Sequence, residues 1–125
     1  LIKDGLTTRR GFTDKHEYLT RLRFAPDDNS NEIWIMNFGG HPNSLGGANR
    51  KLSGEYPYFM RELITEKKGA DVIFTIGAIG AMDCAHLSDD NLECVKLQGK
   101  MIAEASLKQS LSQRLNIFSS HFILM

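Results

Sequence analysis

A long polar, glycine-rich stretch, NFGGHPNSLGGANRKLSGEYP over residues 37–57, follows directly on a run of large apolar residues. Loops of this length inside a domain are usually either disordered or functional. His41 stands near its start, and Pro42 restricts the histidine backbone to an extended conformation. A stiff backbone suits a metal ligand or a catalytic base, which has to be held in one orientation. His41 is therefore a candidate functional residue, and a loop histidine bonded to a carbonyl is the alternative.

Strand patterns precede this loop. Residues 18–24 alternate apolar and polar side chains, which is typical of a half-buried strand. Residues 32–38 are apolar on both faces and predict a second strand. The connecting residues 25–31 are rich in Asp and Asn, which favour turns. Together these segments predict a β-hairpin.

Helices and a strand alternate after the loop. A helix is predicted from Pro57 to Gly69, because proline suits the first helical turn and glycine the stop. Its apolar stripe is predicted to comprise Tyr58, Met60 or Phe59, Leu63 and Ile64. Residues 70–77 are apolar and β-branched, which is typical of a strand covered on both faces.

The last part of the chain predicts a long helix over residues 88–115, capped by Ser88 or Asp89, and a final strand over residues 116–125. Its apolar side is predicted to comprise Val95, Met101, Ile102, Ala105 and Leu111. The predicted fold class is α/β, a mixed sheet with flanking helices. All 125 residues are predicted to form a single α/β segment, and we expect it to be part of a larger catalytic domain.

Charge and hydropathy exclude some classes of function. Lys plus Arg and Asp plus Glu both number 15, and nucleic-acid binders usually carry a basic excess or a basic face. We therefore expect no nucleic-acid partner. No apolar run approaches the roughly 20 residues that span a bilayer, so no transmembrane segment is expected. A homo-oligomer remains possible.

A second glycine-rich turn, GAIGAMDCAH over residues 77–86, follows the strand predicted at residues 70–77. Ligands bind beyond the carboxyl ends of strands in open α/β sheets, so the two glycine-rich segments are expected to lie side by side. This turn lacks the full G-x-G-x-x-G pattern of dinucleotide-binding proteins. Cys84 and His86 could form a nucleophile–base pair or two metal ligands. Cys84 and Cys94 could also pair with each other, and two free thiols are the alternative to that pairing.

The order RLRF, IWIMNFGGHP, SGEYPYFMREL, DVIFTIGAIGAMD, GKMIAEA resembles the amino-terminal catalytic domain of the neutral/alkaline non-lysosomal ceramidases and their bacterial relatives. The resemblance extends over about residues 9–105. Members of that family are zinc-dependent amidases that cleave the amide of N-acylsphingosine, with two histidines, a glutamate and a tyrosine on the zinc. His41 matches the second histidine, and the resemblance implies that the other three ligands lie outside residues 1–125.

The resemblance also implies roles for other residues. Arg9 or Arg10 matches an arginine that faces the oxygen end of the acyl chain, a role that suits the guanidinium fork. The family also has a Ser-small-acidic-aromatic motif, which is expected to support the metal site and to contact the substrate. Ser53, Glu55 and Tyr56 match this motif.

One turn departs from the family pattern. Asp83 stands where ceramidases have a serine proposed to take part in catalysis, and Ala81 replaces the acidic residue. Asp83 could act as a base or as a hydrogen-bond acceptor near the metal. It joins Arg9 and Arg10 as a candidate catalytic residue.

The sequence thus predicts a zinc-dependent amide hydrolase that cleaves a small-molecule or lipid N-acyl amide of the ceramide type. The alternative is a non-catalytic ceramidase-like domain that binds a lipid or glycan or has a structural role. A third hypothesis is a cysteine hydrolase that uses Cys84 and His86.

Overall fold

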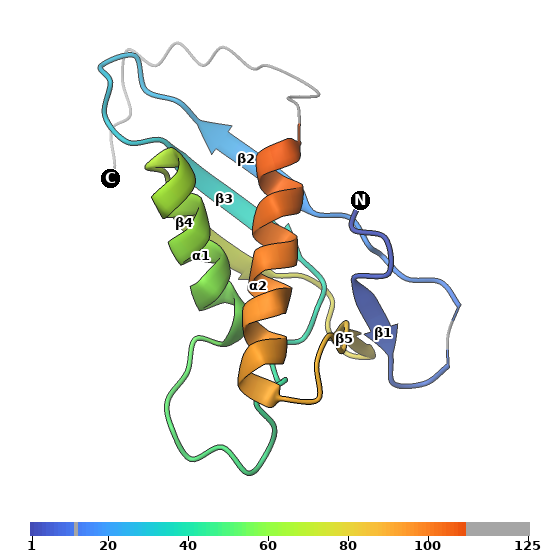
Figure 1. The fold of residues 1–125 in the computed structure, drawn as a ribbon. Coiled ribbons are helices and arrows are strands. Elements are labelled where there is room, and N and C mark those ends of the chain that lie inside the picture. The colour runs from blue at the N-terminus through green and yellow to red at the C-terminus, as the bar shows by residue number, and fades with distance from the viewer. Residues whose placement is uncertain (12, 110–125) are drawn as a thin grey trace, which may run out of the picture.

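The fold is α/β, as the sequence predicted, and the computed structural model describes residues 1–11 and 13–109. The elements along the chain (Figure 1) are β1 Leu6–Thr8, β2 Thr20–Phe24, β3 Ile33–Phe38, α1 Glu55–Lys68, β4 Asp71–Ile76, β5 Met82–Cys84 and α2 Asn91–Lys108. The strand predicted at residues 116–125, and Leu111 of the predicted helix stripe, lie outside the described residues.

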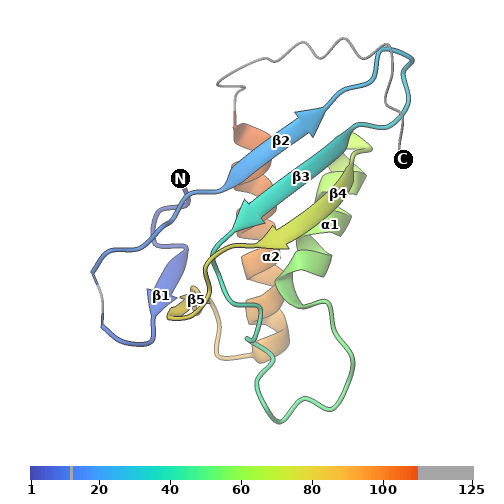
Figure 2. The ribbon, with the colours of Figure 1, turned by 180° about the vertical axis from the view of Figure 1, so that it is seen from behind.

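The main sheet has the order β2-β3-β4. β2 and β3 pair antiparallel, which confirms the predicted hairpin. β3 and β4 pair parallel, and α1 connects them along the chain. Both helices cover the same face of this sheet, as the opposite views in Figures 1 and 2 show.

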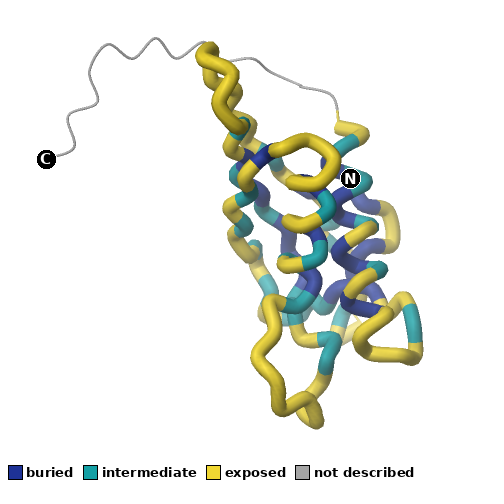
Figure 3. The backbone as a smooth tube through the Cα atoms, turned by 60° about the vertical axis from the view of Figure 1, so that its left-hand side comes forward, coloured by how far each residue is buried: buried dark blue, intermediate teal, exposed yellow. Residues whose placement is uncertain are grey.

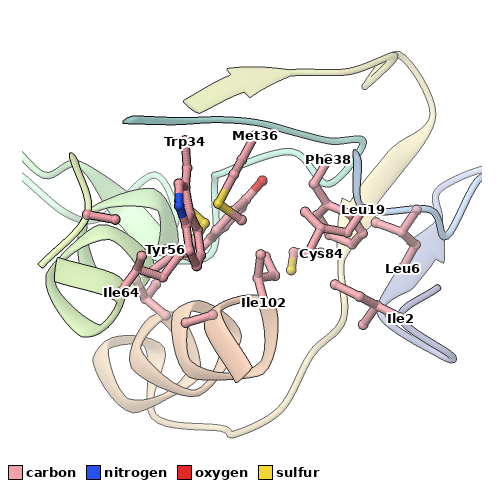
Figure 4. Packing of buried hydrophobic residues seen from close by; sticks show 14 residues of the cluster. Ile2, Leu6, Leu19, Trp34, Met36, Phe38, Tyr56, Ile64, Cys84 and Ile102 are labelled. Atoms are coloured by element: carbon pink, nitrogen blue, oxygen red, sulfur yellow. The ribbon is translucent and has the colours of Figure 1, made fainter. Parts of the chain in front are cut away.

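The core lies between the sheet and the helices. Alternate residues of β3, namely Trp34, Met36 and Phe38, are buried and point toward the helices (Figure 4). They meet a buried stripe on α1 and another on α2, formed by Tyr56, Met60 and Ile64 and by Val95, Ile102 and Ala103.

The predicted stripe on α1 was partly wrong. The helix begins at Glu55, two residues before Pro57, and its buried residues are spaced four apart at Tyr56, Met60 and Ile64. Tyr58 falls on the outer side and is 44% exposed. The stop at Gly69 is confirmed, since this residue adopts the left-handed conformation and its N–H donates to the Thr65 carbonyl.

The other face of the main sheet is open. Its apolar side chains Leu22, Phe24, Ile33 and Ile73 are between 41 and 53% exposed, and none of the described helices covers them (Figure 2). The expectation that both faces of β4 are covered is therefore wrong for the described part of the chain. Buried residues lie on the facing sides of the sheet and the helices, and the loops at both ends are exposed (Figure 3).

A second, two-stranded sheet, which the sequence did not predict, joins β1 to β5 in antiparallel pairing. Its register sets Leu6 opposite Cys84 and Thr7 opposite Asp83. Leu6 and Cys84 are both buried, and they extend the core beyond the end of the main sheet (Figure 4). This small sheet brings the start of the chain to the turn that follows β4.

The cap of α2 also differs from the prediction. Asp90, not Ser88 or Asp89, is the N-cap, and its carboxylate accepts a 2.7 Å hydrogen bond from the Glu93 N–H. Neither α1 nor α2 has the length and apolar character needed to cross a lipid bilayer.

The two helices make their closest approach at Gly99. A Cβ at this position would lie 2.7 Å from Phe59 Cβ and 2.9 Å from two backbone atoms of α1. Backbone atoms cannot move aside as a flexible side chain can. We expect Gly99→Ala to lower the free energy of unfolding by roughly 1–3 kcal/mol, despite the better helix propensity of alanine.

Thermal or urea unfolding measures this difference. Gly47→Ala is the matched control, because a Cβ there would meet nothing within 4 Å. Equal stability of the two variants would contradict the close helix contact.

Glu32 gives the fold a defined pH dependence. Hydrogen bonds from the Arg23 guanidinium on β2, followed by one from the Trp34 indole, lower the pKa of Glu32 to about 2. The folded pKa lies below the unfolded value of about 4.3, so the stabilisation is present above that pH and is lost as the pH falls toward 2. We expect Glu32→Gln to be less stable than the wild type at pH 7 and equally stable near pH 2.

Denaturant unfolding at several pH values measures this difference. A stability difference that stays constant between pH 7 and pH 2 would show that the carboxylate is not the group involved.

Candidate functional site

The candidate site is built around β5, which is paired on both sides. β1 lies along one edge, and the Arg9 N–H extends this pairing by donating to the Ala81 carbonyl at 3.0 Å. On the other edge His41 forms a parallel bridge with Asp83, and its N–H donates to the Met82 carbonyl at 3.1 Å. The two glycine-rich segments therefore lie side by side, as predicted from the strand ends.

Strand alternation decides which side chains share the outer face of this pairing. Successive side chains of a strand point to opposite faces. Because Leu6 and Cys84 point into the core, Thr7 and Asp83 point away from it. Arg9 is two residues beyond Thr7 and so returns to the same outer face. Arg9, His41 and Asp83 converge there.

The three side chains form one hydrogen-bonded cluster. The Arg9 guanidinium donates to Asp83 from Nε to Oδ2 at 2.7 Å and from Nη2 to Oδ1 at 2.5 Å. The Arg9 Nη2 atom also lies 3.0 Å from His41 Nδ1. Asn43 donates from Nδ2 to Asp83 Oδ1 at 3.1 Å. We name these four residues the Arg9–Asp83 cluster.

Asp83 is ionised and accepts three hydrogen bonds in this cluster. The hydrogen bonds from Arg9 lower the pKa of Asp83 below its ordinary value, and the bond from Asn43 adds to the effect. A general base works best with a pKa near the operating pH, so a carboxylate with a lowered pKa is poorly suited to that role. Of the two roles considered for Asp83, base and hydrogen-bond acceptor, the geometry supports the acceptor.

The tautomer of His41 follows from its partner. A guanidinium only donates hydrogen bonds, so His41 Nδ1 accepts one from Arg9. The hydrogen of the neutral ring is then on Nε2. A metal ion could reach Nδ1 only by displacing Arg9, and Nε2 only if that hydrogen left the atom.

The described residues do not by themselves fit a zinc ion. Catalytic zinc usually takes three protein ligands, and residues 1–11 and 13–109 contain no group of three His, Cys, Asp or Glu side chains that could hold a metal. His41 and Asp83 are adjacent, but both are bonded to Arg9. Zinc binding by His41 stays a prediction that requires further ligands.

Buried polar bonds hold the loop that carries His41. The Tyr56 hydroxyl donates to the Gly40 carbonyl at 2.6 Å, and burial of this side chain raises the pKa of Tyr56. A Cβ on Gly40 would lie 3.2 Å from atoms of Leu6, Phe38 and Cys84, which shows how closely the backbone passes the core. Tyr56 is enclosed and bonded to the loop, and its predicted contact with substrate stays a prediction.

Gln98 of α2 joins both segments of the site. Its Nε2 atom donates to Ser44 Oγ in the loop and to the Ala85 carbonyl after β5, at 2.8 Å in each case. The sequence analysis missed Gln98 and Asn43. A signal for Gln98 existed, because it lies between Val95 and Ile102 on the apolar side of the helix.

Ser53 and Glu55 lie apart from the Arg9–Asp83 cluster, at the start of α1. The Ser53 hydroxyl accepts from the Glu55 N–H at 2.9 Å, and Glu55 Oε1 accepts from the Leu45 N–H at 3.1 Å. Glu55 has a φ of +50°, which side-chain-bearing residues rarely adopt. Strain of this kind is often found near functional sites. Arg10 is exposed and makes no hydrogen bond or ion pair with any described residue.

Cys84 does not have the surroundings of a nucleophile. Burial raises the pKa of its thiol to about 12, whereas reactive cysteines have lowered pKa values. His86 is exposed, and its Nε2 atom lies 3.3 Å from Asp89 Oδ1. Cys84 and Cys94 are free thiols. The geometry argues against the cysteine hydrolase hypothesis.

Comparison of the chain with protein-family models, with curated protein sequences and with solved structures found no match.

The burial of Cys84 gives a direct test. We expect iodoacetamide at pH 8 to leave Cys84 unmodified in the folded protein and to label it fully in urea, because the thiolate is scarce and enclosed when folded. Peptide mass spectrometry measures the labelling. Rapid modification of Cys84 in the folded protein would restore the cysteine hydrolase hypothesis.

Proposed function

We propose that the protein hydrolyses an N-acyl amide and that the Arg9–Asp83 cluster is part of its active site. One observation carries the proposal: Arg9, His41 and Asp83 meet through hydrogen bonds although they belong to three separate segments. His41 is a candidate from its loop, and Arg9 and Asp83 are candidates from the resemblance. The resemblance to ceramidases supplies the reaction type.

Arg9 is the residue best suited to bind the acyl oxygen. Asp83 fixes the plane of the guanidinium through two parallel hydrogen bonds, and the Arg9 side chain is still 42% exposed. A guanidinium has five N–H donors, so donors remain for a substrate oxygen. Fixed donors aimed at an oxygen that gains negative charge stabilise the transition state of amide cleavage.

His41 and Asp83 support this binding. The His41 Nε2 hydrogen is a second donor beside Arg9, while Asp83 positions Arg9 and holds no proton for transfer. Asn43 completes the shell of Asp83.

Zinc remains part of the proposal through the resemblance alone, which gives it His41 and three ligands beyond the described residues. Zinc on His41 would replace either the bond of Nδ1 to Arg9 or the hydrogen on Nε2. When bound, such an ion would supply a water of lowered pKa. No step of the binding described above depends on it.

A non-catalytic domain that binds a lipid or glycan, or has a structural role, is the second candidate. The hydrogen bonds of Asp83 favour this second candidate, because a carboxylate that accepts from three donors is more typical of a structural or binding element than of a base. Catalytic turnover distinguishes the two candidates.

The test measures release of the fatty acid from an N-octanoyl amide by the intact protein, together with zinc content. We expect Arg9→Ala and His41→Ala each to lower kcat/KM by about a hundredfold or more, because each removes a donor at the reacting oxygen. Arg10→Ala is the matched control, since its side chain makes no bond to the cluster, and we expect it to keep most of the activity. Absence of turnover in the wild type, or an equal loss of kcat/KM in the Arg9 and Arg10 variants, would contradict the proposal.

A further inference from the structure

A depression of about 370 Å³ lies beside His41 and is separate from the Arg9–Asp83 cluster. It is bounded by Pro42 of the loop, by the start of α1 and by the end of β4. Tyr58 and Phe74 supply aromatic walls. Pro42 directly follows His41, so a ligand in this depression has one end next to the proposed active site.

Arg61 is the charged group that a ligand can meet there. It is exposed, lies two turns into α1, and makes no hydrogen bond or ion pair within the described part of the chain. A guanidinium without a partner presents its full fork to an anion. The depression also includes Ser53, whose hydroxyl accepts from the Glu55 N–H and keeps its own hydrogen available for donation.

Glu55 also borders the depression, but its carboxylate is directed elsewhere. Its Oε1 atom accepts from the Leu45 N–H, and its Oε2 atom is buried without a partner among the described residues. The Oε2 atom is enclosed, so a ligand in the depression does not meet it directly, although the negative charge of Glu55 lies at the border of the depression. The start of α1 has the positive end of the helix dipole; its N-cap, Gly54, has no side chain, and the Ser53 hydroxyl accepts from the Glu55 N–H. The accessible donors therefore favour an anionic ligand.

We propose that this depression binds the carboxylate of the amine portion of the substrate, so that the preferred substrates are N-acyl amino acids, not uncharged N-acyl amino alcohols. The inference rests on the proposed amide hydrolysis. Arg61 pairs with the carboxylate, and Tyr58 and Phe74 contact the carbon next to it. Water adds across the amide bond: the acyl carbon takes the hydroxyl group, the nitrogen takes the proton, and a fatty acid and an amino acid result.

The test compares two amides that differ only at the proposed anion. N-octanoylglycine and N-octanoylethanolamine share the acyl chain and the amide, and only the first has a carboxylate. We expect the intact protein to hydrolyse N-octanoylglycine with a kcat/KM about tenfold higher or more, because a charge-assisted hydrogen bond is worth about that factor. Arg61→Gln should remove this preference, and Arg61→Lys should keep part of it.

Arg50→Gln is the matched control, because Arg50 is an exposed arginine in the same loop as Pro42 and does not border the depression. It should leave the preference unchanged. Circular dichroism and thermal unfolding verify that each variant folds.

The failure of each proposal gives a different result. Equal hydrolysis of both amides, with no effect of Arg61→Gln, overturns the carboxylate site and leaves amide hydrolysis in place. If neither amide is cleaved, calorimetric binding of N-octanoylglycine decides: Arg61-dependent binding supports the site and rejects hydrolysis. Absence of both binding and hydrolysis rejects both proposals.

Discussion

The pairing of β5 on both edges is the constraint on which the polar cluster depends. Arg9 and His41 come from segments far apart in the chain, and each is placed beside Asp83 by a backbone hydrogen bond to β5. The side chains then need only one rotamer each to meet. Loss of either edge would remove one member of the cluster, because β1 holds Arg9 and the loop after β3 holds His41. A strand of three residues thus sets the geometry of the whole site.

Buried hydrogen bonds from α1 and α2 stabilise this arrangement. Gln98 reaches from α2 to both segments that flank the site, and Tyr56 fixes the Gly40 carbonyl one residue before His41. Leaving a buried partner unsatisfied costs about 1–3 kcal/mol, so these bonds select one conformation of the loop over its alternatives. A glutamine in an apolar helix stripe is unfavourable for packing alone. Its two bonds explain why that position is polar.

Local patterns in the sequence predicted the elements that are long enough to show a period. The hairpin of β2 and β3, the strand β4 and both helices were recognised in this way, and the strand-end rule predicted that the two glycine-rich segments lie side by side. β1 and β5 have three residues each, which is too short for any period to appear. The first residue of the inward face of α1 was misassigned because the predicted helix began at Pro57, which left Tyr56 outside it and put Tyr58 in the stripe with Met60 and Ile64. Asn43 was missed because its role depends on a tertiary contact with Asp83.

The charges of the site divide into a compensated and an uncompensated part. Arg9 and Asp83 form a closed ion pair, so their fields largely cancel and Arg9 acts on a ligand mainly through directed hydrogen bonds. Glu55 Oε1 accepts from the Leu45 N–H, and its Oε2 atom is enclosed without a partner among the described residues. Arg61 is left as the accessible charge at the depression beside His41. In the proposed enzyme, directed bonds at Arg9 would fix where an acyl oxygen lies, whereas the charge of Arg61 would select which molecules are attracted. Orientation and selectivity are therefore separable at this edge of the fold, because they depend on arginines that belong to different elements and have no partner in common.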